Sequence, residues 1–300
     1  MLNKIIYTIL GFGLAFVFYP HVAHDSSSHA AIAGATTTQI SKSSALTAPE
    51  LALNLSAPAL SAKSALAVDL ETSTILYSRN LDQQLPIASL TKLMTALIVI
   101  DRADLNSIIT IKQNDQTVVG TSVGLVAGEQ ITVGSLLKAM LIPSSNDAAL
   151  LLATYVGGTE AGFVSLMNDK AVSLELTHTN FTNPVGWDID DNYSTTLDLI
   201  KMVREFLKYP VLTDITATKQ TTITSVDGQY THQLTTTNKL LLDDPEVVGL
   251  KTGFTSKALG NLIILDIHQD HRVVSIILGS DNREADSQKL LDWLFAVYKW

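Results

Sequence analysis

The pattern of apolar and polar residues predicts a β-hairpin followed by a buried helix at the start of the folded region. Residues 65–70 and 74–77 are short apolar runs on either side of residues 71–73, as expected for two strands joined by a turn. The long apolar run after Pro86 predicts a helix over residues 88–102, because proline suits a helix start and cannot continue a helix from behind.

The middle of the chain is mostly helical in pattern, with apolar residues three and four positions apart or in continuous runs. Pro143 ends one of these helices, and we interpret Ser194 and Pro210 as the cap and the end of another. The predicted helices cover residues 135–141, 147–155, 161–176 and 194–209, with a short strand at 108–111 and loops at 118–128 and 177–193.

In the last third of the chain, strand-length apolar runs are separated by turn residues. Asp227-Gly228 between two such runs is a strong hairpin signal, and Gln269-Asp270 marks another turn. The predicted strands cover residues 220–224, 230–235, 247–254, 261–267 and 273–278, and an amphipathic helix covers 286–298.

The order of these elements, strands, then helices, then strands and a helix, predicts an α/β fold of the α+β kind. The early hairpin most simply joins the late strands in one antiparallel sheet flanked by helices. The helices of the middle then form an inserted, mostly helical region over about residues 86–210.

The N-terminal sequence is distinct from the rest. Residues 5–19 are apolar, follow Lys4, and are too few for an ordinary membrane span but suit a signal-peptide core. Residues 1–33 are therefore expected to be a cleaved signal peptide or an uncleaved N-terminal anchor, and either one places the remainder outside the cytoplasm. We predict a Ser/Thr/Ala-rich linker over 34–60 and the folded domain over 61–300.

Composition narrows the functional classes. The net charge of −9 and the lack of basic runs argue against a nucleic-acid partner. The chain contains no cysteine, which excludes disulfides and thiolate metal sites. The histidines lack the spacing of metal ligands, so neither a metal nor a cofactor is expected.

The first candidate for chemistry is Ser89, which begins a Ser-x-x-Lys step at the start of the predicted buried helix. Lys92 lies three residues later and therefore on the same helix face. A desolvated lysine can act as the base that activates a serine. This spacing alone is weak evidence, because Ser135 and Lys138 repeat it in what we interpret as an ordinary helix N-terminus.

Two later stretches could complete a site. Ser144 and Asn146 lie on a tight connection between two buried helices, where they could point into a cleft or simply cap the next helix. Lys251-Thr252-Gly253 lies inside an otherwise apolar strand, where it could offer a positive charge, a hydroxyl and room for a substrate backbone. The alternative is an edge strand protected by its lysine.

The three motifs together, in this order, are the set found in penicillin-binding proteins and class A β-lactamases. The sequence resembles the low-molecular-mass penicillin-binding proteins that are serine-type D-alanyl-D-alanine carboxypeptidases. The resemblance extends over about residues 61–293 and includes the segments 88–96, 144–149, 183–186, 193–195, 237–241 and 249–255.

The resemblance implies a β-lactamase/DD-peptidase-like fold and a role for each catalytic residue. Ser89 would be the acylated nucleophile and Lys92 its base. Ser144 would take part in proton transfer, and Asn146 would hold both the substrate amide and Lys92.

The same resemblance assigns the substrate-binding residues. Lys251 and Thr252 would bind the terminal carboxylate, with help from Arg283, and Gly253 would lie beside the substrate. The backbone N–H groups of Ser89 and Phe254 would form the oxyanion hole, and no metal or cofactor is implied.

The implied activity is removal of the terminal D-Ala from peptidoglycan stem peptides, with β-lactams as inhibitors of the same serine. Membrane attachment would come from residues 5–19. An endopeptidase that cuts peptidoglycan cross-links is the nearest alternative, and a non-catalytic wall-binding protein of the same fold is an alternative of another class. A β-lactamase is disfavoured because Glu175 is not followed by the pattern that class A enzymes use for deacylation.

Three positions depart from the family pattern. Ser145 stands where glycine is usual, Trp187 stands where leucine is common, and residues 71–74 replace a glycine-containing turn. None of these changes removes a chemical group that the mechanism needs.

Overall fold

The computed structural model describes residues 47–113, 118–188 and 191–300. The predicted signal or anchor segment, 1–33, and residues 34–46 of the predicted linker lie outside the described residues. All statements below refer to the described part of the chain.

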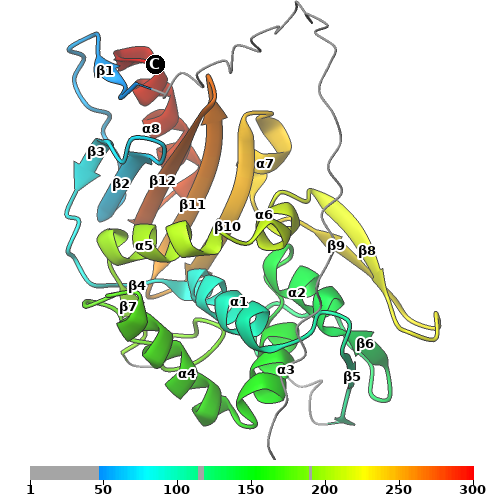
Figure 1. Ribbon diagram of the computed structural model, residues 1–300. Helices are drawn as coiled ribbons and strands as arrows, with labels where there is room; N and C mark the ends of the chain where they lie inside the picture. Colours follow the sequence, from blue (N-terminus) through cyan, green and yellow to red (C-terminus); the bar gives the residue numbers. More distant parts are fainter. Residues whose placement is uncertain (1–46, 114–117, 189–190) are drawn as a thin grey trace, which may run out of the picture. The chain divides into compact units, whose positions relative to one another are not determined.

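A five-stranded antiparallel sheet forms the centre of the domain, in the order β10-β11-β12-β2-β3 (Figure 1). The prediction that the early hairpin joins the late strands is therefore confirmed. Strands β2 and β12 pair directly, for example Ala67 with Ser275, and most of their residues are buried on both faces. The strands are β2 (Ser64–Asp69), β3 (Ile75–Arg79), β10 (Val247–Thr255), β11 (Leu259–His268) and β12 (His271–Ser280).

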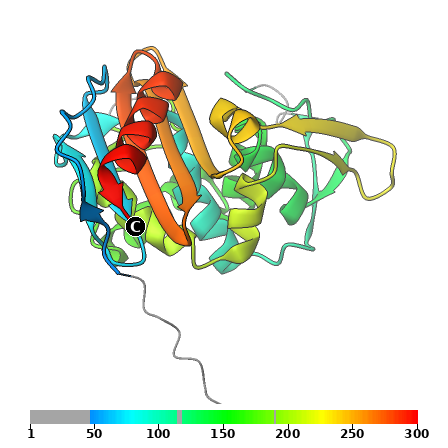
Figure 2. The ribbon, with the colours of Figure 1, turned by 90° about the horizontal axis from the view of Figure 1, so that it is seen from above.

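Helices cover both faces of this sheet (Figure 2). On one face lies α8 (Arg283–Val297), the predicted final helix, whose Leu290 and Leu294 pack in a core with Leu262 and Ile277. On the other face lie α1 (Thr91–Arg102) and α5 (Thr196–Phe206), which belong to a larger core shared with the other helices of the inserted region. Burial on two faces explains why the central strands are nearly continuous apolar runs.

The helices predicted for the inserted region are present, but a further helix extends past the predicted end at about residue 210. The region contains η1 (Ala88–Leu90), α1, α2 (Val133–Leu141), α3 (Asn146–Gly157), α4 (Glu160–Ser173), α5 and α6 (Pro210–Thr216). No single described helix is long and apolar enough to cross a membrane. The pair α3 and α4 meets that criterion only when taken together, with a bend of 84° between them.

Two details of the predicted helix at 194–209 are wrong. Ser194 lies in the short strand β7 (Tyr193–Ser194), which pairs with β4 (Leu85–Pro86), and Thr195 caps α5 by accepting a hydrogen bond from Asp198 N. Helix α5 ends at Phe206, and Pro210 begins α6 instead of ending α5, because proline is well suited to the first helical position.

Short two-stranded sheets surround the main one. The hairpin predicted around Asp227-Gly228 is confirmed, but it forms its own sheet rather than joining the central one. The remaining pairs join distant segments, including the two ends of the described chain. The strand pairs are β8 (Gln220–Thr224) with β9 (Thr231–Thr235), β5 (Ile108–Thr110) with β6 (Gln130–Thr132), and β1 (Glu50–Leu51) with β13 (Tyr298–Lys299). A short helix, α7 (Lys239–Asp243), precedes β10.

Candidate active site

Ser89 and Lys92 lie where a short 3₁₀ turn passes into α1, near the centre of the domain. Ser89 is within η1 and partly exposed, whereas Lys92, in the first turn of α1, is completely buried. The residues that follow Lys92 are apolar and form the buried part of α1, as the apolar run in the sequence predicts, whereas Pro86 lies upstream in β4. The predicted placement of both residues is therefore confirmed.

Lys92 Nζ has three oxygen neighbours: Ser89 Oγ at 2.8 Å, Asn146 Oδ1 at 2.7 Å and the Val185 carbonyl at 2.8 Å. The amide and carbonyl oxygens can only accept hydrogen bonds. A neutral amine would therefore donate its two N–H groups to them and direct its lone pair at the Ser89 hydroxyl. This is the geometry that a general base for serine requires.

The electrostatic surroundings favour that neutral form. Burial lowers the pKa of Lys92 well below its ordinary value, and the positive charge of Lys251 lowers it further, while Asp147 acts in the opposite direction. A lysine whose pKa is lowered in this way gives up its proton more readily, and the neutral amine can accept the serine proton.

Ser144 and Asn146 come from the connection between α2 and α3, as predicted. Asn146 is the first residue of α3, and its amide oxygen faces Lys92. Ser144 has a positive φ of 66°, which is uncommon for a residue other than glycine. Its buried Oγ has no hydrogen-bond partner within the described ranges.

Lys251 and Thr252 lie on β10, which is an edge strand of the central sheet. The edge-strand part of the alternative interpretation is therefore confirmed, but Lys251 is only 1% exposed and does not project into solvent as a protective lysine. Burial and the positive charge of Arg283 lower the pKa of Lys251 to about 7. The Thr252 hydroxyl forms a short hydrogen bond with that of Thr237, a residue for which the sequence analysis predicted no role.

Gly253 brings β10 against the nucleophile. A Cβ atom at this position would lie 2.9 Å from Ile87 O and 3.2 Å from Ser89 N, so a side chain would push the strand away. The glycine therefore permits close packing of β10 on η1, in addition to the predicted approach of a substrate backbone.

Arg283, at the start of α8, is held rather than solvated. One guanidinium nitrogen donates to Gly253 O at 2.9 Å, and Nε donates to Glu284 Oε1 at 2.9 Å. Together with the exposed Phe254 and with Lys239, it lines a cavity of about 520 Å³ beyond the end of the Lys-Thr-Gly segment. The sequence alone placed Arg283 near the site but could not show this contact with the strand.

The sequence analysis also missed the part of the long loop that supports Ser89. Val185 supplies the carbonyl on Lys92, and Gly186 lies directly beneath the 3₁₀ turn. A Cβ atom on Gly186 would lie 1.8 Å from Ala88 O, and the residue has a φ of 89°. The recognisable Asn-Pro-x-Gly segment at 183–186 was the available signal.

The second Ser-x-x-Lys step has no such surroundings. Ser135 interacts with the helix cap Thr132, and Lys138 is exposed. The described residues contain no group of three or more His, Asp or Glu side chains that could hold a metal ion.

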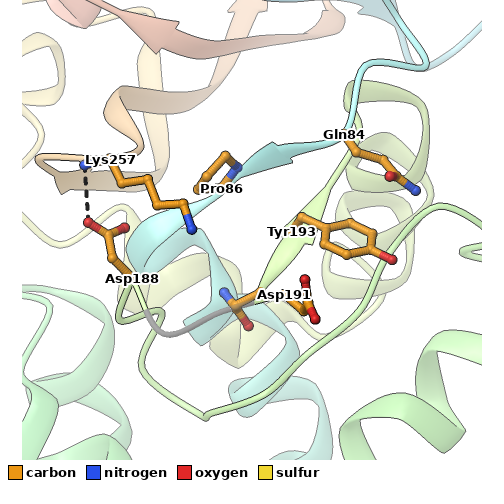
Figure 3. A pocket seen from close by; sticks show the side chains of 7 residues that line it. Gln84, Pro86, Asp188, Asp191, Tyr193 and Lys257 are labelled. Carbon is orange, nitrogen blue, oxygen red and sulfur yellow. Dashed lines mark hydrogen bonds between the residues drawn. The ribbon is translucent and has the colours of Figure 1, made fainter.

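A separate polar cavity of about 280 Å³ lies between Pro86, Asp188, Tyr193 and Lys257 (Figure 3). The Lys257 backbone N–H donates to Asp188 at 3.1 Å across its rim. None of the predicted site residues lines this cavity.

Comparisons with known proteins agree with this geometry. Residues 52–282 match the peptidase S11 family, described as D-alanyl-D-alanine carboxypeptidase. The chain is 33% identical to the Bacillus subtilis D-alanyl-D-alanine carboxypeptidase DacF, over 79% of this chain and 63% of that protein. It therefore spans less than two thirds of that relative's length.

Other relatives carry related names. The chain is 31% identical to an Escherichia coli D-alanyl-D-alanine endopeptidase, over 81% of this chain and 80% of that protein. The crystal structure of the Streptomyces K15 DD-transpeptidase is similar to this one with a TM-score of 0.77 and 28% identity, over 81% of this chain and 100% of that structure.

Proposed function

The chain belongs to the D-alanyl-D-alanine carboxypeptidase family, and we propose that it is a penicillin-sensitive serine D-Ala-D-Ala carboxypeptidase. The observation that carries the proposal is the position of the buried Lys92 amine, 2.8 Å from Ser89 Oγ. Its other two neighbours, Asn146 Oδ1 and Val185 O, accept hydrogen bonds and so leave the lone pair of a neutral amine directed at Ser89. A serine with such a base can form an acyl-enzyme.

In the proposed reaction, Lys92 takes the proton of Ser89 while Oγ attacks the carbonyl carbon of the penultimate D-Ala. The negative charge that develops on the carbonyl oxygen is stabilised by the backbone N–H groups of Ser89 and Phe254. The C–N bond then breaks, the leaving amine of the terminal D-Ala receives a proton through Ser144, and water later hydrolyses the ester on Ser89.

The other residues bind the substrate in this proposal. Lys251 and Thr252 bind the terminal carboxylate, because the buried ammonium offers a charge that water does not screen. Arg283 holds Gly253 O and adds positive charge nearby. Asn146 contacts the substrate amide as well as Lys92.

Peptidoglycan stem peptides are the proposed substrates, and β-lactams are the proposed inhibitors, since both present an amide carbonyl and a carboxylate to the same groups. A substrate in the cell wall requires a location outside the cytoplasm. The apolar residues 5–19 support export or attachment to the membrane from that side.

Labelling with a fluorescent penicillin tests the nucleophile. The wild type should form a stable labelled band and should release D-Ala from a stem pentapeptide, whereas Ser89→Ala should do neither. A band that persists in folded Ser89→Ala, or a wild type that is not labelled, would contradict the proposal.

The endopeptidase reaction is the second candidate, supported by the relatives that carry this name. It uses the same residues but a larger leaving group. A comparison of product release from a cross-linked muropeptide and from a pentapeptide separates the two activities.

A further inference from the structure

A loop over residues 118–128, here named the arch, contacts the Ser-x-Asn motif. Asn146 Nδ2 donates to Val119 O at 2.8 Å, and Asn146 N donates to Thr121 O at 2.7 Å. Because Nδ2 is bound to the arch, Oδ1 of the same amide faces Lys92 at 2.7 Å. The arch therefore determines which end of the amide meets the catalytic lysine.

The arch has further bonds to the start of α3. Ser122 Oγ donates to Asp147 Oδ2 at 2.6 Å, and Val123 N donates to Ser145 Oγ at 3.1 Å. Ser145 stands where glycine is usual in the family pattern, so this chain has a hydroxyl contact to the arch that glycine could not make.

The other side of the arch is held by a histidine from a distant part of the chain. His232, on β9, places Nδ1 3.1 Å from Val123 O and Nε2 2.9 Å from Glu129 Oε1. Both side chains are buried, and Glu129 Oε2 also accepts a hydrogen bond from Val126 N. The histidine and the glutamate thus hold the middle and the end of the arch.

This pair is unlike an ordinary surface ion pair. Both ring nitrogens face acceptors, and a ring protonated on both nitrogens can donate to both at once. Burying a histidine and a carboxylate together is costly unless their hydrogen bonds are satisfied. The proposed reaction uses neither residue directly, so their contact with the arch calls for another role.

We propose that His232, held by Glu129, is a positioning residue that fixes the arch and, through Val119 O, the orientation of Asn146 beside Lys92. This inference rests on the proposed function, which assigns Asn146 to the reaction. Without the bond to Val123 O, the arch can shift and the Asn146 amide loses its fixed partner. Lys92 then has one acceptor fewer to direct its lone pair at Ser89.

Acylation by a penicillin gives the test, with the rate at saturation measured separately from the half-saturating concentration. His232→Gln should lower the saturating rate by about 10- to 100-fold, the size expected for a misplaced catalytic group. The half-saturating concentration should stay close to that of the wild type, because Lys251 and Thr252 still bind the carboxylate. Glu129→Gln should lower the saturating rate less, because it preserves the shape of the pair.

Gln233→Ala is the matched control. Gln233 is the next residue on β9 and its exposed side chain pairs with Thr222 on the outer face, so its loss should leave acylation unchanged. The melting temperature of each variant shows whether it folds. If His232→Gln does not fold, Glu129→Gln decides the question, and a wild-type saturating rate in that variant overturns the inference.

A double-mutant cycle with Asn146→Ala distinguishes positioning from general destabilisation. If His232 acts through Asn146, then His232→Gln should have little further effect on acylation once Asn146 is alanine. An equal fold-loss in both backgrounds overturns the inference. If penicillin acylates the wild type and His232→Gln at the same saturating rate, the inference is also overturned. A wild type that no penicillin acylates overturns the proposed function and this inference with it.

Discussion

At the scale of single residues, burial gives two lysines different properties from those on the surface. Lys92 and Lys251 are almost inaccessible, and desolvation is the main reason why the pKa of each is lowered. The lowering suits Lys92 as a base, whereas Lys251 must carry its proton to attract a carboxylate. The two lysines therefore impose opposite pH requirements.

The dependence of kcat/KM on pH should follow from these requirements. The value of kcat/KM should rise with pH as Lys92 loses its proton. It should fall above about pH 7, where Lys251 of the free enzyme loses its proton. In Arg283→Ala the alkaline limb should move to higher pH, because Arg283 contributes to lowering the pKa of Lys251.

Arg283→Lys keeps the positive charge and is the control, with an alkaline limb near that of the wild type. Steady-state rates on a carboxylate-terminated peptide between pH 5 and 10 measure both limbs. An unmoved alkaline limb in Arg283→Ala would show that repulsion from Arg283 does not set it.

The two Ser-x-x-Lys steps should differ completely in function. Ser135→Ala should keep penicillin acylation at the wild-type rate, because Ser135 hydrogen-bonds to the helix cap Thr132 and Lys138 is exposed. Ser89→Ala should lose acylation. Loss of acylation in a folded Ser135→Ala protein would mean that the nucleophile is misassigned.

At the scale of elements, the site is made where separate segments pack closely rather than within one of them. The 3₁₀ turn η1 lies between β10 and the loop at 183–188, and a glycine at each contact lets the backbones approach. That loop is also tied to the end of β10, where Thr255 Oγ1 donates to Asp188 Oδ1 at 2.5 Å. The position of Ser89 thus depends on packing from both sides.

Gly186→Ala should therefore displace Ser89 and slow its acylation. The new methyl group would overlap Ala88 O, so either η1 or the loop must move, and a displacement of about 1 Å can cost about 100-fold in rate. We expect acylation to fall by at least about that factor, together with a lower melting temperature.

Gly228→Ala is a control matched in backbone strain. Its φ of 76° is close to the 89° of Gly186, but a Cβ atom there would meet nothing within 4 Å. This variant should be acylated normally. If both variants lose acylation equally, backbone strain rather than the clash beneath Ser89 is responsible.

At the scale of the whole molecule, the two ends of the described chain pair with each other. Strand β1 pairs with β13, and Ala52 N and Leu53 N both donate to Val297 O. The predicted linker, 34–60, was expected to precede the folded domain at residue 61. Its described part instead makes ordered contacts with the end of the chain.

Truncation should separate these contacts from the site. A chain of residues 61–300 should melt about 2–4 °C lower than a chain of residues 47–300, the shift expected for about 1 kcal/mol in a domain of this size. Both should be acylated by penicillin at the same rate, because β1 and β13 contribute no site residue. Equal melting temperatures would show that the β1–β13 contact adds no stability.

The sequence by itself determined the elements of the central sheet, most of the helices and the three motifs of the site. Apolar periodicity and turn residues are local signals, and Ser89, Lys92, Asn146 and Lys251 stand in recognisable local patterns. The errors occurred where a neighbour in space decides the conformation. Ser194 resembles a helix cap, but it pairs with β4 instead.

The motifs in the sequence already favoured Ser89 over Ser135, but only the tertiary structure decided which groups surround Ser89 and Lys92. Val185 O on Lys92, Thr237 on Thr252 and His232 on the arch all join segments far apart in sequence. Composition and periodicity record whether a residue will be buried, but not which distant group it will meet. That information exists only once the chain has packed, because the pKa of Lys92 and its aim at Ser89 both come from that packing.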